Sequence, residues 1–250
     1  MRGCFLEELT WDEAEKHFNA GTPVLVPVGA FAKEHGLHLP LKTDSVIARH
    51  LAKKVAEVLP VVVAPVVGFG YYPAFVDYPG SQHVSAETFI ALMTEILIGF
   101  VHQGARRLAV LNTGYSTEAP LRLAARAVLE KRAVSVAMAD LRHLGQGSRK
   151  RLRQTGGGHA DEHETSLMLA IEPDAVRLER ALRVEETPRA DTAPWTQPGI
   201  FSRDPENPDY SASGATGDPT LANAELGREF LDEMVTELIK GLRRLYPDLD

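Results

Sequence analysis

Short apolar runs alternate with longer stretches of mixed character along most of the chain. Four of these runs are five or six residues long, rich in Val, Leu and Ala, and typical of buried strands. They cover residues 24–28, 61–66, 107–111 and 133–138. The stretches between them place apolar residues on one side of a helix, and they predict helices at residues 10–19, 44–59, 85–103, 118–131 and 222–245. This alternation predicts an α/β fold in which helices cover a mainly parallel sheet.

The stretch from residue 190 to residue 219 breaks this alternation, because it is dense in Pro, Gly, Ser and Asp. We expect a long surface loop there rather than a linker between two domains. A chain of 250 residues can bury one substantial hydrophobic core. The sequence therefore predicts a single α/β domain over residues 1–250.

Composition and charge narrow the classes of protein to which the chain can belong. The net charge is −7 and no basic patch is interleaved with aromatic residues, so we expect no binding to nucleic acid. No apolar run is long enough to cross a bilayer and the first residues lack the apolar core of a signal peptide, so we expect no membrane association. A single cysteine, Cys4, fits a reducing compartment, and we expect a cytoplasmic protein.

Side chains of the kind that bind metal ions are concentrated directly after the first apolar run. Residues 33–44 contain two histidines, His35 and His38, and two carboxylates, Glu34 and Asp44. Open α/β sheets bind ligands in loops at the carboxyl ends of their strands, and imidazole with carboxylate suits Zn, Mn or Fe. Asp44 also begins a predicted helix, where it can act as the N-cap. The alternative is that these histidines are ordinary buried groups with satisfied hydrogen bonds.

A second concentration of such side chains precedes an apolar helical turn. His159 follows three consecutive glycines, which let the backbone approach another group closely. Burying Glu164 beside the apolar turn without a cation or a partner would be costly, so we interpret His159 and Glu164 as functional. Asp161 and Glu162 have a simpler interpretation, because carboxylates stabilise the positive N-terminal end of a helix.

Three segments together resemble the creatininase (creatinine amidohydrolase) family. The stretch from Lys33 to Asp44 is similar to the family's Glu-x-His-Gly-x-His-Leu-Pro-x-x-x-Asp segment. The stretch from His159 to Ser166 resembles its His-Ala-x-x-x-Glu-Thr-Ser segment, and residues 213–219 resemble its Gly-x-x-Gly-Asp-Pro stretch. The segments keep the family's order over about residues 23–220, which is most of the chain.

This resemblance implies a three-layer α/β/α sandwich with a mainly parallel central sheet. It also implies a metal-dependent hydrolase that cleaves a cyclic amide or another C–N bond outside the peptide backbone of proteins. The expected partner is then a small-molecule substrate. Because members of the family form oligomers, often hexamers, the resemblance further implies a homo-oligomer.

The chain departs from the family pattern at three positions where the family has metal ligands. Lys33 replaces the first-segment Glu, Gly114 replaces the His of the middle segment, and Ser116 replaces a second Glu found in some members. The resemblance then implies one divalent ion per chain (Zn, Mn or Fe) rather than two. Its expected ligands are His35, Asp44 and Glu164.

Two further residues have catalytic roles by this resemblance. His159 would carry a proton from the attacking water to the leaving nitrogen. Lys33 would supply a fixed positive charge in place of the missing ion and stabilise the developing oxyanion. The interval from Gly29 to His35 looks one residue longer than usual, so an alternative pairing would turn Glu34 inward instead of Lys33.

The substrate and the activity both remain open from the sequence alone. Residues 145–153 form a basic segment where the creatininase pattern has tryptophans that enclose the substrate. This segment would suit an anionic substrate, and it could equally be a solvated loop or a contact between subunits. The replacements at Lys33 and Gly114 favour a second hypothesis, a catalytically degenerate family member that serves small-molecule binding or assembly.

Overall fold

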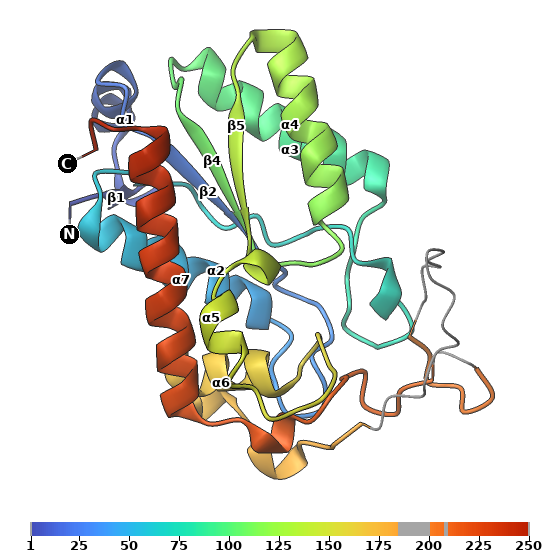
Figure 1. The fold of residues 1–250 in the computed structure, drawn as a ribbon. Helices are drawn as coiled ribbons and strands as arrows, with labels where there is room; N and C mark the ends of the chain where they lie inside the picture. Colours follow the sequence, from blue (N-terminus) through green and yellow to red (C-terminus); the bar gives the residue numbers. More distant parts are fainter. Residues whose placement is uncertain (1, 185–200, 208–209, 250) are drawn as a thin grey trace.

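A five-stranded parallel sheet forms the centre of the computed structural model, which describes residues 2–184, 201–207 and 210–249 (Figure 1). The strand order is β1-β3-β2-β4-β5. The strands are β1 (Cys4–Phe5), β2 (Val24–Val28), β3 (Val62–Val63), β4 (Leu108–Asn112) and β5 (Val136–Asp140). Since all four pairings are parallel, the carboxyl ends of the strands lie at one edge of the sheet.

Alternate side chains of the central strands enter two different hydrophobic layers, because successive residues of a strand point to opposite faces. Val24, Val26 and Val28 pack with α1, α3 and α4, whereas Leu25 packs with α2, α6 and α7. Figure 1 shows α3 and α4 on one side of the sheet and α7 on the other. The predicted three-layer α/β/α arrangement is therefore confirmed. The helices are α1 (Trp11–Asn19), α2 (Thr43–Val58), α3 (Ala86–His102), α4 (Glu118–Arg132), α5 (Gln146–Arg149), α6 (Glu162–Ile171) and α7 (Ala224–Leu245).

The observed strands follow the apolar runs, with differences at their ends. The run at residues 24–28 is β2 without change, whereas only Val62–Val63 of the run at 61–66 is paired as β3. The last strand begins at Val136 instead of residue 133. Ala133 ends α4 in the left-handed conformation, with φ of 53°, so the chain cannot extend until it has turned.

The helix N-termini show which capping predictions hold. Thr10 and Glu13 form the expected capping box, and the Ser85 side chain accepts a hydrogen bond from the Thr88 backbone N–H. The prediction that Asp44 caps α2 is wrong, because Lys42 occupies the cap position and makes no side-chain cap bond. Asp44 lies inside the first turn, and its carboxylate is directed to other partners described below.

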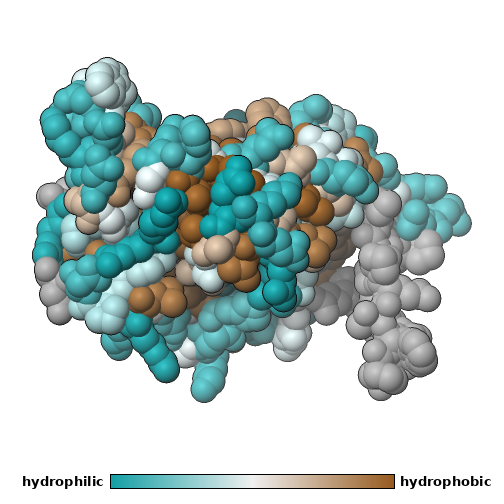
Figure 2. Space-filling model, turned by 90° about the horizontal axis from the view of Figure 1, so that it is seen from above, coloured by the Kyte–Doolittle hydropathy of each residue, from teal (hydrophilic) through white to brown (hydrophobic). Residues whose placement is uncertain are grey.

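The edge strand β5 is half-buried along most of its length. Between β5 and α7 lies a groove of about 340 Å³, lined mainly by apolar side chains such as Ala137, Leu238 and Leu242. Figure 2, a view from above, shows apolar side chains gathered near the middle of the face with hydrophilic ones around them. An open apolar groove beside an unpaired strand edge is a common feature of surfaces that contact other molecules.

The predicted surface loop at 190–219 can be followed only in part. Residues 190–200 and 208–209 lie outside the described residues, and the rest holds an isolated bridge between Ser202 and Tyr210 and a short 3-10 turn at Pro219–Leu221. Over the described ranges, no helix combines the length and the apolar character needed to cross a membrane.

Helices α6 and α7 approach each other closely at one glycine. A Cβ atom on Gly227 of α7 would overlap the backbone carbonyl of Ser166 in α6. Ser166 also links the two helices by accepting a hydrogen bond from the Asn223 backbone N–H at 3.1 Å. Because α6 carries candidate site residues, this contact fixes their position against the longest helix of the structure.

We expect Gly227→Ala to lower the free energy of unfolding by about 2 kcal/mol, because the added methyl group overpacks the α6–α7 contact. Gly241→Ala on the same helix is the matched control, since nothing lies within 4 Å of a Cβ atom there. That change should raise stability by about 0.5–1 kcal/mol through helix propensity. Urea unfolding of both variants measures the difference, and equal effects would contradict the close contact.

Candidate metal centre

The candidate site lies at the carboxyl edge of the sheet, as the sequence predicts. The loop between β2 and α2 carries Lys33, Glu34 and His35, and the first turn of α2 carries Asp44. A cavity of about 370 Å³ opens there, lined by residues that follow β4 and β5 and by the segment leading into α6. Charged side chains in this loop are buried, so each must find a partner inside the protein.

Asp44 is the centre of the first group of contacts. Its Oδ2 lies 2.7 Å from Nζ of Lys33, and its Oδ1 lies 2.9 Å from Nε2 of His35. The other ring nitrogen of His35, Nδ1, lies 2.9 Å from the backbone oxygen of Lys33 and must donate to it, because a carbonyl oxygen only accepts. The three residues are each at most 5% exposed. The buried carboxylate of Asp44 thus joins the loop after β2 to the first turn of α2.

Lys33 and Asp44 each stabilise the charged form of the other. Burial would raise the pKa of Asp44, but the Lys33 ammonium and His35 hold it below its ordinary value. Burial would likewise lower the pKa of Lys33, and the nearby carboxylates of Asp44 and Glu164 outweigh it and raise the pKa instead. Lys33 therefore stays charged and Asp44 stays ionised at neutral pH.

The second group of contacts surrounds His159. Its Nε2 lies 2.9 Å from Oε2 of Glu34, and its Nδ1 lies 3.7 Å from Oε2 of Glu164. The same Glu164 oxygen accepts a hydrogen bond of 2.6 Å from the Ala160 backbone N–H. Burial raises the pKa of Glu164, which His159 and Lys33 offset only in part. A cation beside this carboxylate would therefore stabilise its ionised form.

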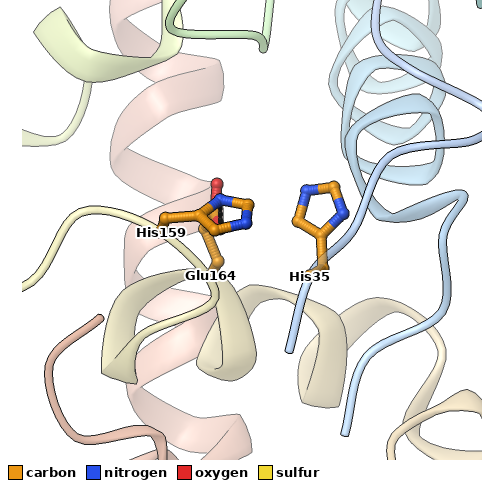
Figure 3. A group of neighbouring side chains, drawn as sticks. All are labelled: His35, His159 and Glu164. Carbon is orange, nitrogen blue, oxygen red and sulfur yellow. Dashed lines mark ion pairs between the residues drawn. The ribbon is translucent and has the colours of Figure 1, made fainter. Parts of the chain in front are cut away.

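The two groups face each other across a short gap. Figure 3 shows the His35 ring opposite the His159 ring, with Glu164 beside His159. The ring centroids are 4.9 Å apart. One ligand atom from each of His35, His159 and Glu164 lies within 4.8 Å of the others. The structure thus brings His35, His159 and Glu164 together, whereas Asp44, the third predicted ligand, is not a member of this group and contacts His35 and Lys33.

Lys33 and Glu34 both point into the protein, so the two alternatives of the sequence are not exclusive. Lys33 contacts Asp44, whereas Glu34 contacts His159. Burial would raise the pKa of Glu34, but His159 lowers it below its ordinary value. Gly214 makes this burial possible, since a Cβ atom there would overlap the Glu34 carboxylate. The third segment of the resemblance therefore packs directly on the site.

Helix α6 begins as its sequence predicts. The Asp161 carboxylate caps it by accepting hydrogen bonds of 3.0 and 3.1 Å from the backbone N–H groups of His163 and Glu164. Glu162 instead turns back and accepts from the backbone N–H groups of Arg153 and Gln154, each at 2.8 Å. The expected role at the helix terminus holds for Asp161 as a cap, while Glu162 fixes the preceding loop.

The segment after β4 supplies no ligand side chain and is closed around Asn112. The Asn112 side chain donates to Asp140 Oδ1 at 2.8 Å and accepts from the Thr117 hydroxyl at 2.7 Å. A Cβ atom on Gly114 would lie 2.6 Å from Thr117 Oγ1. This segment is therefore packed for a glycine and has no room for a histidine at that position without a shift.

Two aromatic residues at the site carried no signal in the sequence. The Phe75 ring lies tilted against His159 with ring centroids 4.2 Å apart, and Phe201 stacks on Phe75 at 5.4 Å. Phe75 ends a short 3-10 helix at Pro73–Phe75. Neither residue belongs to a recognisable sequence pattern, so only the folded chain reveals them.

His38, the second histidine of the first segment, contacts the Thr165 hydroxyl at 2.8 Å, and burial lowers its pKa to about 4. It acts as a structural tether.

A second cluster at the rim of the cavity has a different character. Glu118, Asp140 and His143 offer ligand atoms within 4.8 Å of one another. However, Glu118 is held by Arg122 at 2.8 Å and by Arg142 at 2.7 Å. These ion pairs already neutralise the carboxylate, so we interpret the cluster as a network of salt bridges.

Fold and site together define a class of α/β proteins with a buried imidazole and carboxylate centre at the sheet edge. The chain belongs to the creatininase family, because the family profile described as creatinine amidohydrolase matches residues 7–242. The resemblance stated from the sequence is therefore confirmed.

Individual relatives agree with this assignment. A creatinine amidohydrolase of Pseudomonas putida is 27% identical over 98% of both chains. A mycofactocin precursor peptide peptidase of Mycolicibacterium smegmatis is 30% identical over 90% of this chain and 86% of its own. A solved structure of creatininase with Mn superposes with a TM-score of 0.84 at 26% identity, over 98% of this chain and 99% of its own. These relatives are named as hydrolases acting on different compounds, so the family does not fix one substrate.

We expect Lys33→Met to lower the free energy of unfolding at pH 7 by about 3 kcal/mol, because it leaves a buried carboxylate without its cation. Unfolding is measured in chelator, and Lys16→Met, which removes an exposed ion pair with Asp12, should cost under about 1 kcal/mol. The double variant with Asp44→Leu should recover much of the loss.

The pH dependence provides a second check on the same pair. Because folding lowers the pKa of Asp44, the ionised carboxylate contributes its full stabilisation above the pKa of the unfolded chain, which is about 4. This stabilisation is lost as the pH falls below that value and the folded carboxylate takes up a proton. In Lys33→Met the carboxyl accepts a proton more readily, so the deficit against wild type should shrink in acid. A deficit that is constant from pH 7 to pH 3 would contradict the pairing.

Proposed function

We propose that this protein is a metal-dependent hydrolase that acts on a cyclic amide or another C–N bond outside the peptide backbone of proteins. One divalent ion, Zn, Mn or Fe, is bound by His35, Asp44 and Glu164. Membership of a family of hydrolases supports the general class. The single observation that carries the proposal is the position of His35, which offers a ligand atom within 4.8 Å of one on Glu164 and whose Nε2 lies 2.9 Å from Asp44 Oδ1.

The donors at this point suit an ion. Histidines that bind metals commonly donate their other ring N–H to a backbone carbonyl, and Nδ1 of His35 does so to Lys33. Ligand atoms about 2.1 Å from one ion and at right angles to each other are separated by about 3 Å. The distance of 2.9 Å between His35 Nε2 and Asp44 Oδ1 is compatible with such sharing. Glu164, whose burial His159 and Lys33 compensate only in part, completes the set.

Binding of one ion rather than two follows from the side chains that replace ligands. The ammonium of Lys33 lies against Asp44 Oδ2, the atom that would otherwise face a second cation. Gly114 offers no donor, and the packing of Thr117 leaves little room for one. The Lys33 ammonium would therefore supply the positive charge that a second ion would otherwise bring.

The residues of the chain then have distinct tasks in hydrolysis. A bound ion lowers the pKa of water and polarises a carbonyl group. His159 accepts a proton from the attacking water and delivers it to the leaving nitrogen, while Glu34 holds its Nε2 and fixes the ring. Lys33 stabilises the oxyanion, since its charge is retained in the buried site. Phe75 and Phe201 form an apolar wall beside His159 that limits access of bulk water.

Metal analysis of purified protein tests the number of ions. We expect about one equivalent of divalent metal per chain after loading and desalting, and we expect His35→Ala and Glu164→Gln to lose it. His102→Ala, at the exposed end of α3, is the control that should keep the metal. Two equivalents per chain would refute the one-ion proposal.

A screen of cyclic amides and formamides with added Zn, Mn or Fe tests the chemistry. With a substrate in hand, His159→Gln should lower kcat about a hundredfold or more, because the general acid–base group is lost. His35→Ala should abolish the metal-dependent activity. Activity that ignores metal and survives the His35→Ala change would remove this mechanism.

The Lys33–Asp44 pair and the closed Gly114 segment favour one alternative. A catalytically degenerate member would keep the fold for small-molecule binding or assembly, with the ammonium neutralising the centre in the absence of metal. Such a protein would bind no divalent ion under any loading condition and would turn over none of the screened amides.

Assembly and location complete the proposal. We expect a homo-oligomer in the cytoplasm that binds a small-molecule substrate, and an anionic one where the basic segment at 145–153 contacts it. The apolar groove between β5 and α7 supports assembly, because it gives a second copy of the chain a surface on which to pack.

A further inference from the structure

Arg149 faces the active-site cavity without an ion-pair partner among the described residues. It is the last residue of α5, is partly buried, and lines the same cavity as His159 and Glu164. Its Nε and Nη2 reach only the backbone oxygens of Leu144 and Leu141, each at the long distance of 3.4 Å. Its Nη1 has no hydrogen-bond partner in the part of the chain that the structure describes.

The other arginines nearby behave differently. Arg151 pairs with Glu229, and Arg153 lies 3.6 Å from a Glu162 oxygen, so both charges are compensated. Arg142 at the rim is held by Glu118. Burial lowers the pKa of Arg149 and the charges of Asp161 and Glu164 oppose this effect, but neither carboxylate forms an ion pair with it. Its guanidinium is therefore available to a ligand.

His163 provides an independent observation at the same end of the cavity. It lines the cavity and is 2% exposed, yet its Nε2 has no hydrogen-bond partner. Its ring packs edge-on against Phe230 with centroids 4.6 Å apart, which fixes its orientation. A buried ring nitrogen without a partner is rare in native proteins, and beside a cavity it is a candidate contact for a bound group.

The two residues supply different groups at this end of the cavity. Arg149 supplies a positive charge, since a guanidinium stays protonated in proteins, and the imidazole of His163 can donate one hydrogen bond from Nε2. Such a pair matches a ligand group with one negative charge and two acceptor atoms, which describes a carboxylate.

We propose that Arg149 and Nε2 of His163 bind the carboxylate of the substrate, whose scissile C–N bond lies at His159. The substrate class is then a small amide or lactam that carries a carboxylate. The cavity of about 370 Å³ has room for such a molecule, since it equals the space of about a dozen water molecules. This inference rests on the proposed hydrolase function, which it makes more specific.

Binding to the metal-free full-length protein tests the inference without turnover. The probes are pyroglutamate and its neutral carboxamide, measured in chelator by isothermal titration calorimetry. Wild type should bind the carboxylate at least about tenfold more tightly than the carboxamide. Arg149→Met should remove this preference, Arg149→Lys should keep part of it, and Arg151→Met, the matched control in the same segment, should keep all of it.

Circular dichroism and thermal unfolding establish that each variant is folded. If Arg149→Met does not fold, His163→Gln and Arg149→Lys carry the test, and both should weaken the carboxylate without changing the carboxamide. Equal binding of the two probes to wild type would overturn the inference. So would tighter binding of inorganic phosphate at the same residues, since phosphate would then be the group recognised.

Failure of this inference is distinguishable from failure of the hydrolase proposal. A metal-loaded protein that hydrolyses neutral and anionic amides equally well would overturn the carboxylate site and leave the hydrolase intact. Selective binding of pyroglutamate by a protein that hydrolyses nothing would support the carboxylate site and remove the hydrolase.

Discussion

The buried carboxylate of Asp44 holds the candidate site together, because one oxygen forms an ion pair with Lys33 and the other lies 2.9 Å from Nε2 of His35. A single unpaired charge at this depth would cost several kcal/mol, and the two partners offset that cost. The contacts also tie the loop after β2 to the first turn of α2, so the ring of His35 is fixed opposite His159. The geometry of the centre depends on this arrangement.

Lys33, which stands where the family pattern has a glutamate, is consistent in charge with a centre that binds one ion instead of two. The resemblance implies that family members place a carboxylate and a divalent cation beside the aspartate, which together carry one positive charge. A lysine ammonium carries the same charge without a metal. Under the proposal of one ion per chain, the Lys33 ammonium would supply the charge of the second ion, for which Gly114 offers no ligand.

Much of the fold follows from local pattern, whereas the site follows only in part. The apolar run at 24–28 and the capping residues Thr10 and Ser85 predict their elements, because short-range propensity and burial agree there. Asp44 was expected to cap its helix, but the tertiary contact with Lys33 overrides that preference. The basic segment at 145–153 was recognisable, but the position of Arg149 in the cavity and the role of Phe75 were not, because both depend on which distant segments the fold places around the cavity.

A crystal grown with excess Mn, with anomalous diffraction collected at the metal edge, tests the central claim most directly. The account predicts one anomalous peak per chain, bounded by His35, Asp44 and Glu164, with Nζ of Lys33 still against the other oxygen of Asp44. Two peaks, or a Lys33 side chain displaced from Asp44 by an ion, would contradict it.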